Sequence, residues 1–167
     1  MNWDAIGAVG EILGAFAVVA TLIYLASQVK HAKEAAADIN RIARATGVRE
    51  FKLAMAANDD LRNGVNKVMG GDKYIAEMAA KLGVPEADMS RTESANVHWF
   101  WLHWGQYAST TSEEDLAELR NLIAGFYSNP GVRVSREQSP YARPILDPGF
   151  VNFVDQILAE VDQEKSS

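Results

Sequence analysis

The sequence predicts an all-α protein, with one N-terminal transmembrane helix that continues into a stalk and then a small bundle of about five helices. Two observations predict this fold. Residues 5–29 form an apolar run interrupted by a single ionisable residue, Glu11. After the stalk, turn and capping residues divide the chain into short segments whose apolar residues recur at helical spacing. We therefore divide the chain into an anchor at 1–29, a stalk at 30–58 and a cytoplasmic helical domain at 59–167.

The anchor has the length of a membrane span. At about 1.5 Å per residue, a helix over 5–29 is about 37 Å long, and a bilayer's hydrocarbon core is about 30 Å thick. A buried core helix is usually shorter and has a polar stripe, whereas Ile12 to Ala26 contains no charged side chain. A secretory signal would carry Lys or Arg before the apolar run, where this chain has Asp4. The sequence therefore favours a span over both alternatives.

The flanks of the run predict its orientation. Basic residues follow the run, beginning with Lys30 and Lys33, and none precedes it. Because basic residues stay on the cytoplasmic side, we expect the N-terminus outside and the later domain inside. Trp3 and Tyr24 are suited to the two interfaces, and together with Lys30 and Lys33 they are the predicted interfacial anchors.

One face of the predicted span collects its small residues. Gly7, Gly10, Glu11, Gly14 and Thr21 fall within about a third of the circumference at ~100° per residue. Gly10 and Gly14 form a GxxxG step, which lets two helix backbones approach closely in lipid. Two interpretations remain open: two helices pack against each other through this face, or the glycines share one side by chance. Glu11 itself lies either at the outer headgroup boundary or, paired or protonated, inside the bilayer.

Composition excludes several classes of function. The net charge of −6 argues against nucleic-acid binding, which needs a concentrated basic surface. The chain has no cysteine, which excludes disulfides, thiolate metal sites and cysteine nucleophiles. His98 and His103 lie ~140° apart on a helix and so do not share a metal site; we expect them to hydrogen-bond locally. No catalytic, cofactor or metal residues are predicted, and the protein is expected not to be an enzyme.

Capping residues predict where the helices between residues 58 and 107 begin and end. Asn58-Asp59-Asp60 predicts a break and a new helix start, and Gly70-Gly71 predicts its end. A short helix is expected from about Lys73 to Leu82. Ser90-Arg91-Thr92-Glu93 has the pattern of a capping box and is expected to begin an aromatic helix at 91–107. That helix is expected to be central in the domain or to lie against the membrane.

The remaining helices follow from similar signals. Thr111 with Glu114, or Ser112 with Asp115, is expected to cap a helix through LAELRNLIAGFY. Residues 129–131 predict a turn, and 132–148 are expected to be irregular. Asp147 as a cap and Pro148 in the first turn are expected to begin the final helix.

The opening NWDAIGAVGEILGAFAVVATLIYLASQ resembles a family of small, uncharacterised bacterial single-pass membrane proteins that begin with an Asn-Trp-acid-Ala-Ile-Gly block. NPGVR at 129–133 and PGFVNFVDQIL at 148–158 resemble that family's C-terminal half. Members often carry paired tryptophans soon after NPGVR, where this chain has Val134-Ser135, so packing there is expected to differ. The resemblance implies a bacterial inner membrane and the layout of an anchor followed by helices. It implies no site residues.

Three functions remain open from the sequence. The first is a non-enzymatic membrane protein that self-associates or scaffolds through the small-residue face, with the lipid bilayer and further copies as partners. The second is an accessory subunit of a larger membrane complex, for example an energy-transducing one. The third is a membrane-tethered enzyme or ligand binder, which a deep polar pocket with a strongly shifted carboxylate would favour.

Overall fold

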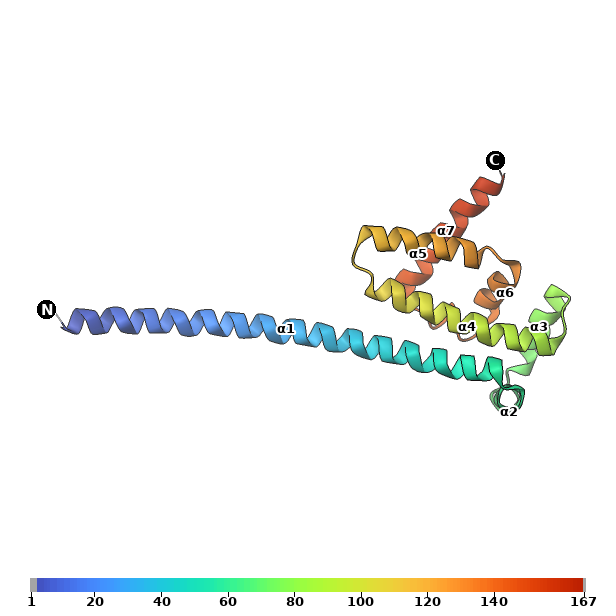
Figure 1. The fold of residues 1–167 in the computed structure, drawn as a ribbon, viewed down its shortest axis with the longest axis horizontal. Coiled ribbons are helices and arrows are strands. Elements are labelled where there is room, and N and C mark those ends of the chain that lie inside the picture. The colour runs from blue at the N-terminus through green and yellow to red at the C-terminus, as the bar shows by residue number, and fades with distance from the viewer. Residues whose placement is uncertain (1–2, 167) are drawn as a thin grey trace. The chain divides into compact units, whose positions relative to one another are not determined.

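The computed structural model describes residues 3–166, apart from the side chains of 3–6 and 9. The described chain consists of seven α-helices without strands, which confirms the all-α prediction (Figure 1). Contacts divide it into two units, Met1–Asn40 and Arg41–Ser167. The helices are α1 (Trp3–Ala57), α2 (Asp59–Met69), α3 (Asp72–Leu82), α4 (Glu86–Ser109), α5 (Glu113–Tyr127), α6 (Pro130–Gln138) and α7 (Pro148–Ser166).

Helix α1 runs without interruption through the predicted anchor and stalk and ends at Ala57. Asn58 then leaves the helical conformation, with φ −128° and ψ 108°, and its side-chain oxygen accepts a hydrogen bond from the backbone N–H of Leu61 at 2.9 Å. That bond satisfies one of the free N–H groups at the start of α2. The expected break at Asn58 is confirmed.

Two glycines end α2 and α3 in the left-handed region. Gly70 has φ 71° and Gly83 has φ 67°, and each N–H donates back to a carbonyl of its helix. A side chain at either position would strain the backbone, so these are the ends that the sequence predicts. Gly71 has a different role, because a Cβ there would lie 3.0 Å from Oδ1 of Asn66.

Helix α4 begins earlier than the sequence predicts. It starts at Glu86 after Pro85, and acidic residues occupy its first turn. Ser90 and Glu93 therefore lie inside the helix, where both side chains are buried, and the capping-box prediction is wrong. Tertiary contacts explain the error, because Ser90 accepts from Asn66 at 2.7 Å and Glu93 pairs with Lys52.

The last three helices confirm two caps and correct one segment. Ser112 caps α5 by accepting from the N–H of Asp115 at 3.0 Å, the second of the two predicted pairs. Asp147 caps α7 by accepting from Gly149 and Phe150 at 2.9 and 3.2 Å. The expected turn at 129–131 and the expected irregular segment at 132–148 are both wrong over 130–138, where α6 forms, and residues 139–147 are non-helical as expected.

Helix α4 is central in the unit formed by residues 41–166. It contacts α2, α3, α5, α6 and α7, which confirms its predicted central place. The main core joins α4 to α5 and α7 and to residues 45 and 48 of α1, and a smaller one joins α3, α4 and α6. The two most buried residues of α4 in the main core are Val97 and Phe100, both fully inaccessible to solvent. The core thus covers most of the apolar residues of α4, although Trp99 is 44% exposed.

Aromatic rings enclose His103 within this core. Its ring lies 5.3 Å from Phe126 and 5.7 Å from Tyr127, measured between centroids. Among the described residues, neither Nδ1 of His103 nor the hydroxyl of Tyr127 has a hydrogen-bond partner, although both atoms are buried. His98 differs, because its Nδ1 lies 3.1 Å from the carbonyl oxygen of Arg49. His98 thus has a hydrogen bond, although its partner lies 49 residues away in the sequence, whereas Nδ1 of His103 has none.

Burial of His103 predicts loss of stability in acid. Burial lowers its pKa from 6.5 to about 4. The unfolded chain takes up the proton at about pH 6.5, whereas the folded protein resists it down to about pH 4. The free energy of unfolding should therefore fall by up to about 3 kcal/mol across that interval as pH decreases. Denaturant titrations of the full chain in detergent, followed by circular dichroism, measure this slope.

The control is a histidine outside the core. His103→Leu should flatten the slope between pH 6.5 and 4, whereas His31→Leu, at an exposed position of α1, should leave it unchanged. An identical slope in His103→Leu and the parent protein would contradict this assignment.

Candidate functional site

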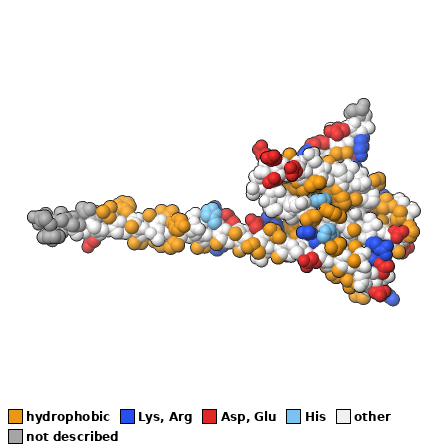
Figure 2. Space-filling view, in the orientation of Figure 1, with side chains coloured by type: hydrophobic (Ala, Val, Ile, Leu, Met, Phe, Trp, Pro, Cys, Tyr) orange, Lys and Arg blue, Asp and Glu red, His pale blue; other side chains and the backbone are white. Residues whose placement is uncertain are grey.

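The first candidate site is the apolar surface of α1. Among the described residues, one helix is long and apolar enough to cross a membrane, over Gly10–Ala57, and none of its apolar window is buried. Hydrophobic side chains follow one another along this helix in Figure 2. Its exposed large residues are Ile12, Leu13, Phe16, Val18, Val19, Leu22, Ile23, Tyr24, Leu25 and Val29. This helix is compatible with a single-pass membrane protein.

The predicted packing face lies open on α1. A Cβ added at Gly7, Gly10 or Gly14 would meet no atom within 4 Å. Glu11 is exposed. Thr21 is exposed as well, and its hydroxyl donates to the carbonyl of Ala17 at 2.8 Å. That bond satisfies the hydroxyl within the helix, as an apolar environment requires.

The predicted interfacial anchors also lie along α1. Tyr24, Lys30 and Lys33 are exposed, and Lys30 is 4.0 Å from Glu34 in an i, i+4 pair. The side chain of Trp3 lies outside the described residues. The three described anchors therefore have the exposure that a role at an interface needs.

The second candidate is a buried ion pair that the sequence did not predict. Lys52 of α1 and Glu93 of α4 are 2% and 1% exposed, and Nζ lies 3.5 Å from Oε2. Oε1 of Glu93 accepts from the Ser139 hydroxyl at 2.6 Å, and Nζ stands 3.9 Å above the ring centre of Tyr141. Three distant segments of the chain thus meet at one pair of charges.

Burial dominates the electrostatics of this cluster. Loss of hydration lowers the pKa of Lys52, and the nearby Glu93 carboxylate opposes that shift. Burial raises the pKa of the Tyr74 phenol, and the negative charge of Glu93 adds to the effect. The adjoining pocket, lined by Lys52, Tyr74 and Tyr141, has a volume of about 90 Å³. That volume is well below the roughly 300 Å³ at which small-ligand pockets begin, so the cluster joins helices rather than enclosing an organic ligand.

Sequence reasoning missed Lys52 because a lysine in a stalk is usually solvated. A signal was nevertheless present. Ala45, Val48 and Met55 lie at i, i+3 and i+10 on one stripe of α1, and Lys52 occupies the i+7 position of that stripe. Both Ala45 and Met55 are buried. A charged residue in the middle of a buried stripe indicates a partner of opposite charge.

A second charged cluster joins α6 to α7. Arg136, 3% exposed, donates to Asp155 at 2.8 Å, and Arg143 donates to both oxygens of the same carboxylate at 2.8 and 2.9 Å. Burial raises the pKa of Asp155, but the hydrogen bonds from Arg143 and Arg136 outweigh it and lower the pKa below its usual value. These contacts hold the non-helical segment 139–147 against both helices.

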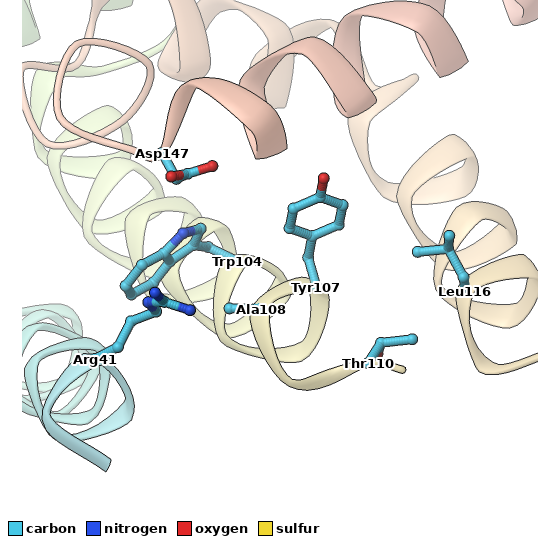
Figure 3. Close-up of a pocket in the computed structure, with 7 residues that line it drawn as sticks. All are labelled: Arg41, Trp104, Tyr107, Ala108, Thr110, Leu116 and Asp147. Atoms are coloured by element: carbon cyan, nitrogen blue, oxygen red, sulfur yellow. The ribbon is translucent and has the colours of Figure 1, made fainter. Parts of the chain in front are cut away.

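A third candidate is an open groove formed by two pockets that share Arg41, Trp104 and Asp147, which we call the Trp104 groove. One pocket has a volume of about 370 Å³ and also includes Tyr107 (Figure 3). The other has about 390 Å³ and also includes Arg44, Trp101 and Ile145. The groove's residues come from the latter part of α1, the second half of α4, the segment that leads into α7 and, at Leu116, from α5. Among the described residues, no group of three or more His, Asp or Glu side chains could hold a metal ion.

Comparison with known proteins adds no assignment. No family model, curated protein or solved structure matches the chain. The family resemblance of the opening block therefore stays a prediction.

The buried pair predicts a strong and non-additive effect on stability. Lys52→Met or Glu93→Gln alone leaves a buried group without its partner, so each should lower the free energy of unfolding by about 3–5 kcal/mol. The double variant should lose clearly less than the sum of the two. Denaturant unfolding of the full chain in detergent gives all three values.

A surface pair provides the comparison. Arg91, half exposed, lies 2.9 Å from Asp59, and Arg91→Gln should change stability much less than either substitution of the buried pair. Additive losses in the double variant would show that Lys52 and Glu93 act independently.

Proposed function

We propose that the protein is a single-pass inner-membrane protein that assembles with further copies of itself through α1. The observation that carries this proposal is the complete exposure of the apolar window of α1. Water is a poor solvent for such a surface, whereas lipid tails accept it without loss. The short N-terminus faces outward and the helical domain faces the cytoplasm, because Lys30 and Lys33 follow the span.

The open glycine face supports self-association. Within lipid, helices associate through close packing and not through the hydrophobic effect, so small residues favour contact. Gly7, Gly10 and Gly14 lie on one side with free space above each Cα. Bulky residues such as Ile12 and Phe16 occupy the other side and suit lipid tails. The face is therefore shaped for a second helix, and another copy of α1 supplies one of matching shape.

Substitution on this face tests the proposal. Gly10→Leu or Gly14→Leu should convert detergent-extracted oligomers to monomers, because a leucine side chain separates the two backbones. Ala20→Leu adds the same bulk on the opposite side and should leave the oligomer intact. Analytical ultracentrifugation of the three variants and the parent in mild detergent measures the change.

Two results would contradict self-association. One is a parent protein that is monomeric on its own. The other is co-purification in fixed ratio with foreign subunits, retained in Gly10→Leu and Gly14→Leu, which would assign the chain as an accessory subunit instead.

A further inference from the structure

The Trp104 groove has an aromatic wall built by one helix. Trp101, Trp104 and Tyr107 recur every three residues along α4 and so lie on one side of it. The Trp101 and Trp104 rings meet edge to face, with centroids 5.3 Å apart. The Trp101 indole N–H donates to the carbonyl of Tyr141 at 2.9 Å, which fixes its orientation. Ile145, 52% exposed, extends the apolar surface.

Positive charge faces this wall. Arg41 and Arg44 of α1 line the groove, against one carboxylate, that of Asp147. Arg44 is exposed and forms no ion pair with any described residue. Asp147 already accepts two backbone N–H groups at the start of α7, where the helix dipole offsets its charge. Arg44 therefore supplies a positive charge to the groove in a chain whose net charge is −6.

Two neutral donors complete the lining. Within the described chain, neither Nε1 of Trp104 nor the Tyr107 hydroxyl has a hydrogen-bond acceptor. In Figure 3 the Trp104 ring nitrogen and the Tyr107 oxygen both point toward the side of the pocket where Asp147 begins α7, and the Arg41 side chain extends toward Trp104. The Tyr107 oxygen would lie 3.5 Å from a Cβ on Gly149, so glycine leaves that side uncovered. The indole N–H and the hydroxyl thus point to one side of the first pocket, and Arg44 supplies a guanidinium group to the second.

We propose that the Trp104 groove binds a phosphate ester, with the phosphate on Arg44 and the ester's apolar group on the tryptophans. Guanidinium groups bind phosphate oxygens through paired hydrogen bonds, and indole rings supply apolar contact area. Pockets of about 370 and 390 Å³ have the size of small-ligand sites. The ester is either a phospholipid headgroup or a soluble metabolite, since both present the same chemistry.

Calorimetric titration of the full chain in delipidated detergent micelles tests the site. The probes are phenyl phosphate, which joins both features, and inorganic phosphate and benzyl alcohol, which each have one. Phenyl phosphate should bind more tightly than either. Arg44→Gln should weaken its binding by about tenfold or more, because a charge-assisted hydrogen bond is lost. Lys81→Gln removes the same charge from an exposed position of α3 outside the groove and should have no effect.

A second variant and a lipid probe sharpen the test. Ile145→Asp places a negative charge in the groove at an exposed position and should abolish binding while the circular dichroism spectrum is unchanged. Dihexanoyl phosphatidate that binds more tightly than phenyl phosphate, and depends on Arg44, identifies the ligand as a lipid headgroup; the reverse order identifies a soluble ester. The proposal is overturned if no phosphate ester binds, or if Arg44→Gln and Ile145→Asp bind as the parent does.

Discussion

Apolar side chains along α1, from Ile12 to Val29, face outward with nothing in the described chain to cover them. Removing one large apolar side chain from water contributes about 1.5–3 kcal/mol. Ten such residues therefore represent roughly 15 kcal/mol or more, as much as the net stability of a typical domain. In the bilayer that we propose as their environment, these side chains contact lipid tails, and the free-energy cost of exposing them to water is absent. The proposed roles of the glycine face in packing and of Lys30 and Lys33 as anchors both require a bilayer. The Thr21 hydroxyl donates to the carbonyl of Ala17 and so needs no water as a partner there.

The unit formed by residues 41–166 depends on a different interaction. Lys52 and Glu93 connect α1 to the central helix, and Ser139 adds the segment after α6 to the same carboxylate. A buried pair of this kind contributes less to net stability than to the choice of one arrangement, because every alternative packing leaves a charge without a partner. The same arrangement, together with the packing of Ala45 and Val48 against the core, places Arg41 and Arg44 along the groove that the tryptophans of α4 line.

Much of the fold could be predicted from short stretches of the sequence, because some residues determine helix ends and faces without distant partners. Gly70 and Gly83 end helices by backbone conformation alone, and the period of the first thirty residues reveals the face of α1. Prediction failed where a distant partner decided the outcome. Glu93 matched a capping box, but its partner Lys52 lies 41 residues away. Residues 130–138 contain turn signals, yet they form α6 because Val132 and Val134 are buried against its neighbours. The Trp104 groove likewise joins segments of α1, α4 and α5 and the start of α7, which are distant in the sequence and which no local pattern relates.

Cysteine accessibility in intact cells tests the membrane span most directly, because the chain has no cysteine of its own. Asn2→Cys, Ala20→Cys and Ala36→Cys would each be treated with a maleimide that does not cross membranes. We expect Asn2→Cys to react from outside, Ala36→Cys to react only after the cells are broken, and Ala20→Cys to react only after detergent is added. Equal reaction at all three positions in a detergent-free soluble fraction would contradict the span.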